Sequence, residues 1–334
     1  GAVPRSEVRA EAEALAEAYD GEVDAVFRSA LRGFAVEMSE ADALALSAED
    51  GVARVEEDGI VRTTTTQTNP PWGLDRIDQP DLPLDDSYTA AFQDGTGVRV
   101  YVIDSGIRAT HTDFGGRVES GFVAPAIGGD PGSDCNGHGT HVAGTIAGAT
   151  YGVAKGATLV PVRVFGCSSS TATSNIIAGV DWVTANAVLP AVANMSLRSG
   201  GSATMDTAVT NSMAAGVTYV VAAGNDGNDA CNWSPARVPG AVTVGATTAS
   251  DNVASFSNVG ACLDLFAPGV GIRSAWPYSD TSTAKLSGTS MASPHVAGYV
   301  ARLLQFHLVF AGVPADPATI DYYLSLSTAD NRIR

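Results

Sequence analysis

The chain has 334 residues, of which 45% are hydrophobic and 16% charged, and its 36 acidic and 19 basic side chains give a net charge of -17. This length suffices for two domains, or for one large α/β domain with an appendage. The small charged fraction argues against disorder, and the excess of carboxylates argues against a nucleic-acid partner, because phosphate binding requires clustered Lys and Arg.

The acidic charge is distributed unevenly along the chain. Residues 1–64 carry six basic and 15 acidic side chains, whereas the much longer remainder carries 13 and 21. Four threonines, Thr63 to Thr66, and the Pro-rich segment 69–71 lie at this change in composition. Such segments are typical of exposed linkers, so we expect a first domain at 1–64 and a second at 65–334.

The first domain is predicted to be a small α+β unit. Ala and Leu with regularly spaced Glu predict a helix over residues 6–19, and Ser39 is expected to cap a second helix over 39–47. Strand-like segments occupy residues 23–27, 31–38 and 52–56.

The second domain alternates apolar strands with helices. Five near-continuously apolar segments are predicted to be strands buried on both faces, at 98–103, 159–165, 192–197, 217–223 and 241–246. Helices are expected at 138–149, 174–188 and 203–215, from about residue 290, and at 314–326. The alternation predicts a doubly wound parallel sheet, in which sites lie at the carboxyl ends of strands.

No segment resembles a membrane helix or a signal peptide. The longest apolar run, 299–310, is interrupted by Arg302, Gln305 and His307 and falls short of the roughly 18 residues that a membrane span needs. Residues 1–20 lack a basic region followed by an apolar stretch, so we expect no membrane partner and find no signal peptide.

Four cysteines lie in the second domain, at Cys135, Cys167, Cys231 and Cys262. None form a CxxC pair, which disfavours a zinc cluster or a thioredoxin-like site. An even number fits two disulfides in an oxidising compartment, and spacing alone leaves four buried free thiols as the alternative.

Polar residues follow or open several of these elements. Asp104 ends the first apolar strand, where an isolated Asp is more often a turn residue. His138 and His141 open a helix rich in Gly and Ala. They could bind a metal together, but the glutamate of an HExxH motif is missing, so we favour His138 as a catalytic base and His141 as structural.

Two further polar residues occupy similar positions. Ser290 follows Gly288 at the start of a helix, where it is either a nucleophile or an N-cap, and His295 is expected to belong to the core. Asn225 ends an apolar strand, and its amide can cap a turn or donate a hydrogen bond to a developing oxyanion.

These motifs resemble those of the subtilisin-like serine proteases, specifically the proteinase K and aqualysin branch. The matching segments are Val-Ile-Asp104-Ser-Gly, His138-Gly-Thr-His-Val-Ala-Gly-Thr, Ala-Ala-Gly-Asn225 and Gly-Thr-Ser290-Met-Ala-Ser-Pro-His. The resemblance covers about residues 65–311, and 30–37 and 55–60 resemble the family's propeptide. It implies a subtilisin-like doubly wound sheet preceded by a ferredoxin-like α+β propeptide.

The resemblance implies a secreted, monomeric serine endopeptidase that acts on polypeptides. Ser290 would attack the scissile carbonyl, His138 would transfer its proton, and Asp104 would orient the imidazole. Asn225 and the Ser290 N–H would stabilise the oxyanion.

The resemblance also implies a zymogen. Its propeptide would act as folding chaperone and inhibitor, and would be removed by self-cleavage between Thr64 and Thr65. The family's first propeptide strand is not found in the sequence, so we expect truncation at Gly1. The family's final strand segment is not found either, so we expect either a truncated C-terminus or an abridged fold.

Substrate would lie along two edges, one formed by Ser196, Leu197 and Arg198 and the other by Ala223 and Gly224. The family pattern at the first edge is Ser-Leu-Gly-Gly, from which Arg198 and Ser199 depart. Arg198 could narrow a subsite, contact acidic side chains or point to solvent, while an apolar or aromatic preference remains the family expectation.

The resemblance further implies two disulfides, Cys135–Cys167 and Cys231–Cys262, and structural Ca²⁺ without a catalytic metal. One calcium set comprises Asp264 with the backbone oxygens of Pro239 and Ala241. The other comprises Asp75, Asp78, Gln79, Asp85 and Ser87, for which an acidic surface loop is the alternative.

Two other classes of protein compete with the endopeptidase. A non-catalytic interaction protein with the same fold is disfavoured because all four functional positions are present. A dinucleotide-binding enzyme is suggested by Gly95-Thr-Gly97, but these glycines precede the strand rather than follow it.

Overall fold

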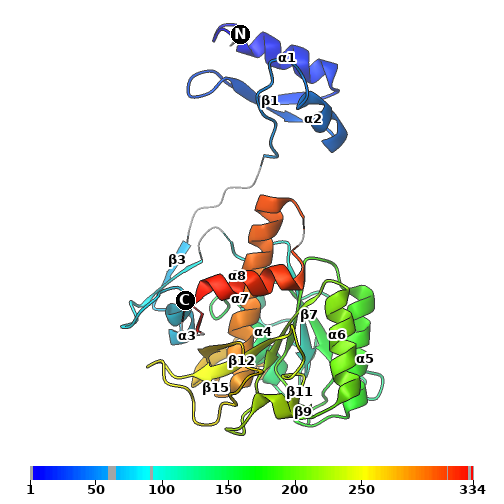
Figure 1. Ribbon diagram of the computed structural model, residues 1–334, viewed down its shortest axis with the longest axis vertical. Helices are drawn as coiled ribbons and strands as arrows, with labels where there is room; N and C mark the ends of the chain where they lie inside the picture. Colours follow the sequence, from blue (N-terminus) through cyan, green and yellow to red (C-terminus); the bar gives the residue numbers. More distant parts are fainter. Residues whose placement is uncertain (1–2, 59–64, 91–92, 314, 330–331, 334) are drawn as a thin grey trace. The chain divides into compact units, whose positions relative to one another are not determined.

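The computed structural model describes residues 3–58, 65–90, 93–313, 315–329 and 332–333 (Figure 1). It divides into two compact units, Gly1–Arg62 and Thr63–Arg334.

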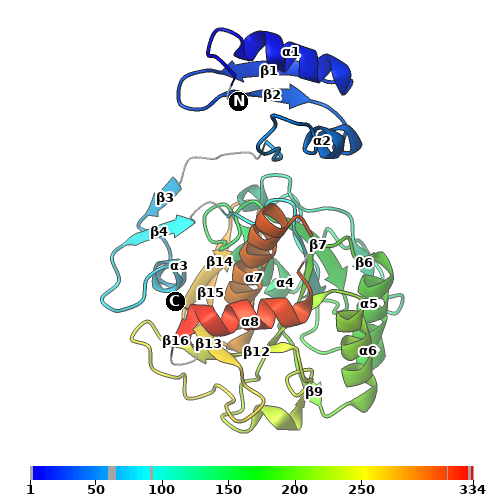
Figure 2. The ribbon, with the colours of Figure 1, turned by 45° about the horizontal axis from the view of Figure 1, so that its top comes forward.

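The N-terminal unit packs a helix against a two-stranded antiparallel sheet (Figure 2). Its elements are α1 (Val8–Ala18), β1 (Glu22–Phe27), β2 (Gly33–Glu37) and α2 (Glu40–Leu46). Val8, Ala12 and Ala16 recur at four-residue spacing and form the buried face of α1. The Ser39 hydroxyl accepts a hydrogen bond of 3.2 Å from the N–H of Asp42, so the predicted N-cap is confirmed.

The predicted strand at 52–56 is wrong. This segment has no strand structure, and the described sheet of the unit contains only β1 and β2. The two valines of this segment suit a strand, but a strand also needs a neighbour for its backbone hydrogen bonds.

The C-terminal unit is built on a sheet of nine described strands in the order β16-β17-β13-β12-β10-β8-β5-β7-β6. Its strands are β5 (Arg99–Asp104), β6 (Phe122–Val123), β7 (Thr158–Arg163), β8 (Ala191–Met195), β10 (Thr218–Ala222), β12 (Val242–Thr247), β13 (Leu265–Pro268), β16 (Thr328–Ala329) and β17 (Arg332–Ile333). Neighbours are parallel except β16 and β17. The chain moves from β5 to one edge, then returns to β8 on the other side of β5, which confirms the doubly wound sheet.

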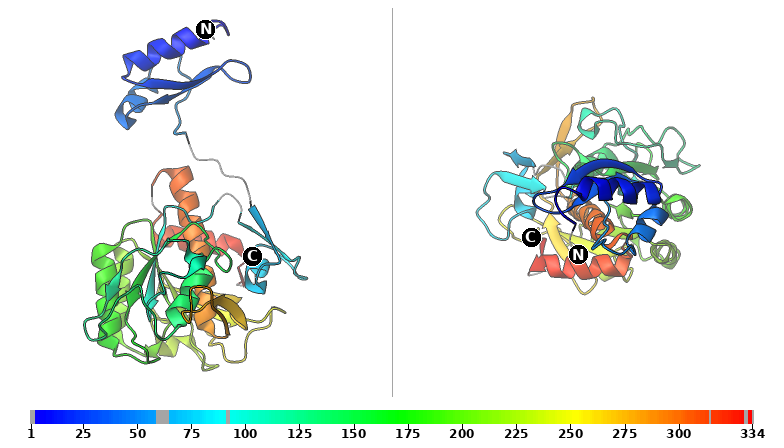
Figure 3. Two further views of the ribbon diagram at one scale, coloured as in Figure 1. Left: turned by 180° about the vertical axis from the view of Figure 1, so that it is seen from behind. Right: turned by 90° about the horizontal axis from the view of Figure 1, so that it is seen from above.

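Helices cover both faces of this sheet (Figures 1 and 3). One face carries α4 (His138–Ala147) and α7 (Thr289–Ala311), and the other carries α5 (Thr173–Asn186) and α6 (Ala203–Ala214). Val100 and Val102 belong to the core on the α4 face, whereas Tyr101 and Ile103 belong to the core on the α5 face. This is why the strands lack alternating polar residues.

The remaining elements frame the sheet. They are α3 (Trp72–Ile77), α8 (Pro317–Ser327), the short helices η1 (Thr112–Phe114) and η2 (Ala230–Asn232), and three antiparallel pairs, β3 (Thr65–Thr68) with β4 (Ser87–Ala90), β9 (Ser199–Gly200) with β11 (Trp233–Ser234), and β14 (Ile272–Ala275) with β15 (Thr283–Leu286). Within the described ranges, no helix has the length and apolar character that a membrane crossing requires.

The end of the chain differs from expectation. We expected no strand after the closing helix, but β16 and β17 follow α8, and Arg332 of β17 pairs in parallel with Phe266 of β13. The backbone of β13 offers hydrogen bonds at the sheet edge, and strands of two residues are too short to show a periodicity in the sequence.

All four cysteines are joined in disulfides. Cys135 is bonded to Cys167 and Cys231 to Cys262, across 32 and 31 residues of sequence. The pairing that the family resemblance implied is confirmed, and the alternative of free thiols is wrong.

Candidate active site

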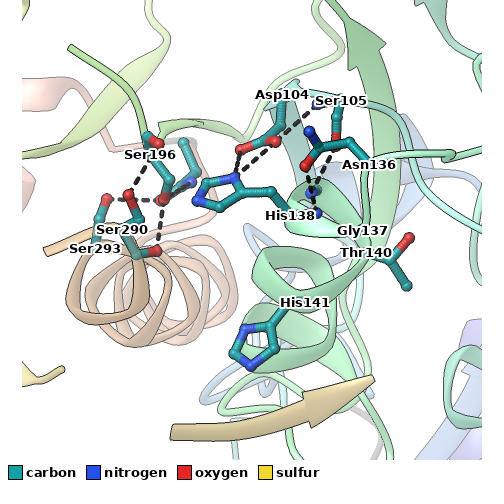
Figure 4. Close-up of polar contacts among 12 residues, drawn as sticks. Asp104, Ser105, Asn136, Gly137, His138, Thr140, His141, Ser196, Ser290 and Ser293 are labelled. Atoms are coloured by element: carbon teal, nitrogen blue, oxygen red, sulfur yellow. Dashed lines mark hydrogen bonds and ion pairs between the residues drawn. The ribbon is translucent and has the colours of Figure 1, made fainter. Parts of the chain in front are cut away.

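The end of β5 meets the first side chain of α4. Asp104 is 2% exposed, and both of its carboxylate oxygens lie 2.9 Å from Nδ1 of His138 (Figure 4). The N–H of Ser105 donates a further hydrogen bond of 2.7 Å to Asp104 Oδ1. The carboxylate thus holds one edge of the imidazole and leaves Nε2 available on the other edge.

Glycine allows α4 to approach β5 this closely. A Cβ at Gly139 would lie 2.2 Å from the carbonyl oxygen of Gly106 and 3.2 Å from the Cβ of Asp104. Any larger residue at this position would therefore move the helix, and His138 with it, away from Asp104.

A second carboxylate, Asp134, caps the start of α4. Its Oδ1 accepts hydrogen bonds from the hydroxyl of Ser105 at 3.0 Å and the N–H of Gly137 at 2.8 Å. Its Oδ2 accepts from the N–H and the hydroxyl of Thr140, at 3.0 and 2.7 Å. Sequence reasoning missed this residue, because it lies three residues before Gly137, the N-cap position at which the usual capping pattern places a polar side chain.

Neighbouring negative charges distinguish His138 from His141 on the same helix and from His295 on α7. Burial favours its neutral form, but the charge and hydrogen bond of Asp104, with the charge of Asp134, outweigh this effect and raise the pKa of His138 above 6.5. In contrast, burial lowers the pKa of His141 and of His295 to about 4.

His141 and His295 are buried and hydrogen-bonded to backbone carbonyls. His141 Nε2 lies 3.0 Å from the Ile272 oxygen, and His295 Nδ1 lies 2.8 Å from the Met291 oxygen. Figure 4 shows His141 pointing away from His138, so these two histidines do not form a metal pair.

Ser290 lies in the first turn of α7 and contacts the end of β8. Its hydroxyl donates a hydrogen bond of 3.1 Å to the Ser196 carbonyl, while the Ser196 hydroxyl donates one of 2.8 Å to the Ser290 carbonyl. Asn194 joins this network, donating to the Ser196 hydroxyl at 3.0 Å and accepting from Ser293 at 2.7 Å. The His138 ring lies between Asp104 and Ser290 (Figure 4).

Asn225 is oriented by the residue before Ser290. Its Oδ1 accepts hydrogen bonds of 2.8 and 2.9 Å from the N–H and hydroxyl of Thr289, and the N–H of Gly224 donates to the same hydroxyl at 3.0 Å. Because the amide oxygen is engaged, the Nδ2 group remains available to donate to a ligand.

Asn258 is a second residue that sequence reasoning missed. It is fully buried, and its Nδ2 donates to the Ala223 carbonyl at 2.9 Å. Its Oδ1 accepts from the N–H groups of Asp226 and Asn228 at 3.0 and 3.1 Å. It therefore holds the turn that presents Asn225, but it is distant in sequence from that turn and had no motif to identify it.

The two expected substrate edges follow β8 and β10. Leu197 is 8% exposed, and Ala223 is fully buried. Arg198 does not simply point to solvent, because its Nη2 lies 2.8 Å from Oδ1 of Asp226.

The expected calcium set of Asp75, Asp78, Gln79, Asp85 and Ser87, here called the first set, extends from α3 to the first residue of β4. Asp75 accepts hydrogen bonds from the N–H groups of Asp85 and Asp86, and Gln79 Oε1 also accepts from the N–H of Asp85. The Asp78 Oδ2 atom accepts from Thr89, whereas Asp78 Oδ1 is buried without a hydrogen-bond partner among the described residues.

Electrostatics in this loop suit a cation. Desolvation is the main cause that raises the pKa of Asp75 and of Asp78, and the neighbouring Asp85 charge raises both further. The Ser87 hydroxyl and N–H both donate to Asp85.

The second expected calcium set lies beside β12. Asp264 Oδ2 accepts a hydrogen bond of 2.7 Å from the N–H of Thr243, and Pro239 and Ala241 precede that strand. Desolvation and the nearby Asp321 charge raise the pKa of Asp264. Within the described part of the chain, no three His, Cys, Asp or Glu side chains are grouped to hold a metal ion.

The expected processing site lies at the edge of the described structure. Thr64 is outside the described residues, and Thr65 begins β3.

Two family models match the chain. A model described as "Subtilase family" matches residues 95–331, and one described as "Peptidase inhibitor I9" matches residues 5–64. The chain belongs to the subtilase family. It is a serine endopeptidase of this family, with an inhibitor domain before the subtilisin-like sheet.

Known relatives agree with this assignment. The chain is 55% identical to the "Extracellular serine proteinase" of Thermus sp. (strain Rt41A), over 85% of this chain and 69% of the relative. It is 51% identical to "Alkaline serine exoprotease A" of Vibrio alginolyticus, over 86% of this chain and 54% of the relative. A solved structure, "Crystal structure of a cold adapted subtilisin-like serine proteinase", has a TM-score of 0.75 and 52% identity, covering 79% of this chain and 93% of that chain.

Titration of the histidines by NMR tests the electrostatics of this subtilase. In isotope-labelled protein, we expect His138 to titrate with a midpoint above 6.5, and His141 and His295 near 4. Replacing Asp134 with Asn removes a charge that raises the pKa of His138, so that midpoint falls. The matched control, Asp181→Asn on the exposed side of α5, leaves it unchanged. Equal His138 midpoints in Asp134→Asn and the parent would contradict this role of Asp134.

Proposed function

We propose that this subtilase cleaves peptide bonds of polypeptides through an Asp104–His138–Ser290 triad and an acyl-enzyme intermediate. The observation that carries the proposal is the contact of the buried Asp104 carboxylate with His138 Nδ1 at 2.9 Å, at the sheet edge where Ser290 also lies. The buried carboxylate selects the tautomer with a proton on Nδ1, so Nε2 is left as the base.

The steps follow from this arrangement. The Ser290 hydroxyl leaves the Ser196 carbonyl, transfers its proton to His138 Nε2 and attacks the scissile carbonyl. Asp104 stabilises the imidazolium that forms, and His138 then gives the proton to the leaving amine as the C–N bond breaks. A water molecule that loses a proton to His138 Nε2 attacks the acyl-enzyme, and that proton returns to Ser290 Oγ as the carboxylic acid leaves. Asn225 Nδ2 and the Ser290 N–H donate hydrogen bonds to the oxyanion.

The N-terminal domain is proposed to be an inhibitor and folding chaperone, removed by self-cleavage between Thr64 and Thr65. The match of residues 5–64 to an inhibitor family supports this proposal. A parallel sheet with many contacts between distant residues folds slowly, which is a physical reason for a folding template. The name of the Thermus relative, "Extracellular serine proteinase", and the two disulfides support secretion. The protein is proposed to act outside the cell, as a monomer, on polypeptides.

Replacing Ser290 with Ala tests the nucleophile and self-processing together. We expect kcat for a peptide substrate to fall on the order of a millionfold. A fluorophosphonate probe should no longer label the protein, and the full chain should remain uncut at Thr64, as seen by mass spectrometry.

Ser250→Ala provides the control. Ser250 is exposed in the turn after β12 and lies outside the hydrogen-bond network that holds Ser290, so its variant should still be labelled and processed. Labelling or cleavage of Ser290→Ala at the parent rate would contradict the proposal.

We also propose that Ca²⁺ binds at the two expected sets. At the first, oxygens of Asp75, Asp78, Gln79, Asp85 and Ser87 would converge on the ion when it binds, since the three carboxylates are not grouped around a common point without it. The unpartnered, buried Asp78 Oδ1 favours a cation there. At the second, Asp264 and the carbonyls of Pro239 and Ala241 would hold the ion. Bound Ca²⁺ would neutralise carboxylates that are otherwise desolvated and close to one another.

Thermal unfolding with and without EDTA tests calcium binding. In the Ser290→Ala background, we expect EDTA to lower Tm by roughly 5 to 10 °C, because a ligand at a hundred times its Kd stabilises a protein by about 2.7 kcal/mol. Asp78→Asn should reduce this EDTA-dependent shift, whereas the control Asp181→Asn should retain it. The same Tm in excess Ca²⁺ and in EDTA would contradict both sites.

A further inference from the structure

Two chain segments bound the space next to Ser290. Residues 196–198 follow β8, and residues 223–225 follow β10. The first contacts Ser290 through the Ser196 carbonyl, and the second is bonded to Thr289 through Gly224 and Asn225. A substrate carbonyl held between Ser290 and Asn225 therefore places the preceding side chain in the gap between these segments.

The side chain of Arg198 reaches from the first segment to the second, where it contacts Gly224 and Asp226. A Cβ built at Gly224 would lie 3.1 Å from Cδ of Arg198, so the aliphatic part of the arginine covers the face of Gly224. Gly224 has a φ of +102° and is itself backed by Asn258, whose Nδ2 would be 2.4 Å from that Cβ. Because Asn258 lies directly behind it, Gly224 cannot move away to make room for a substrate side chain.

The guanidinium of Arg198 is held at its far end. Its Cζ lies 4.1 Å from the centre of the Trp233 ring, and its Nη2 lies 2.8 Å from the Asp226 carboxylate. The Trp233 indole is in turn fixed by a hydrogen bond of 3.0 Å from Nε1 to Asn228. A cation stacked on an aromatic face and paired with a carboxylate loses both interactions if it swings out to solvent.

The strand pairing next to Arg198 adds to this restraint. The residues that follow it form β9, which pairs with β11, so that Gly200 lies opposite Trp233. The backbone of Arg198 and the Trp233 ring on which its guanidinium stacks are therefore connected through the same pair of hydrogen-bonded strands.

We propose that Arg198 is a specificity-determining residue that fills the pocket for the side chain before the scissile bond, so that this subtilase prefers small residues such as Ala there over aromatic ones. The inference rests on the proposed catalytic role of Ser290. It departs from the apolar or aromatic preference expected from the family, where a glycine occupies this position.

Asp226 has a separate part in this arrangement. Its carboxylate neutralises the guanidinium, so the arginine occupies volume without selecting acidic substrates. Removing that charge while keeping the shape, as in Asp226→Asn, leaves an unpaired cation beside the pocket. Such a cation favours a carboxylate in the substrate.

The test uses the full chain, expressed and allowed to mature, with peptide nitroanilides that differ only in the residue before the scissile bond. The parent should have a higher kcat/KM for Ala than for Phe. In Arg198→Gly and in Arg198→Ala, the Phe-to-Ala ratio of kcat/KM should rise by roughly tenfold or more, since apolar volume in a pocket is worth about that factor. In Asp226→Asn, the Glu-to-Ala ratio should rise.

Arg99→Ala is the matched control. Arg99 also forms a partly exposed ion pair, with Glu119 at 3.0 Å, at the amino end of β5, opposite the end that carries Asp104, so its variant should keep the parent's ratios. Two outcomes would overturn the inference: a parent with a higher kcat/KM for Phe than for Ala, or an unchanged Phe-to-Ala ratio in the Arg198 variants that fold.

Labelling separates this inference from the catalytic proposal. Every variant is first titrated with a fluorophosphonate, and the labelled residue is identified by mass spectrometry. Absence of label on Ser290 in the parent would refute the proposed function itself. Normal labelling with unchanged ratios would refute only the role of Arg198.

Discussion

The buried carboxylate of Asp104 is the constraint on which the site depends. A charge at this depth is costly unless it is paired and hydrogen-bonded, and its partners here are His138 and the N–H of Ser105. That pairing requires α4 to begin almost in contact with the end of β5, which a glycine at position 139 permits. Asp134 then closes the helix end and adds a second negative charge near the imidazole. The requirements of folding and of catalysis therefore coincide at this edge of the sheet.

The opposite half of the site is organised by a separate network. Thr289 engages the oxygen of the Asn225 amide, and Asn258 holds the turn that carries that amide. Asn194 and Ser196 hold the turn of α7 that carries Ser290. In both halves, hydrogen bonds orient the side chains and leave His138 Nε2 and Asn225 Nδ2 available, although the Ser290 hydroxyl is bonded to the Ser196 carbonyl and has to turn away from it. In the proposed mechanism, this preorganisation lowers the cost of reaching the charged transition state, because the base and the oxyanion donor do not have to reorient.

The sequence predicted the long apolar strands and the helices between them, and the structure shows why the shorter elements could not be predicted. Strands such as β5 and β10 are continuously apolar because both of their faces are covered, whereas β6, β16 and β17 have two residues each and no readable period. At the site, the family motifs identified Asp104, His138, Asn225 and Ser290 as candidate residues. Asn258 and Asp226 act through contacts between distant segments, which no local pattern reveals. The departure at Arg198 was visible in the sequence, but only the structure shows that it pairs with Asp226 and stacks on Trp233.

A crystal structure of the protein after reaction with a fluorophosphonate tests the central claim most directly. We predict phosphorus bonded to Ser290 Oγ, with a phosphoryl oxygen about 2.7 to 3.1 Å from both Asn225 Nδ2 and the Ser290 N–H, the distances expected for an oxyanion. His138 should remain paired with Asp104 and face the adduct through Nε2. A phosphoryl oxygen that contacts neither donor, or an adduct on a residue other than Ser290, would contradict the account.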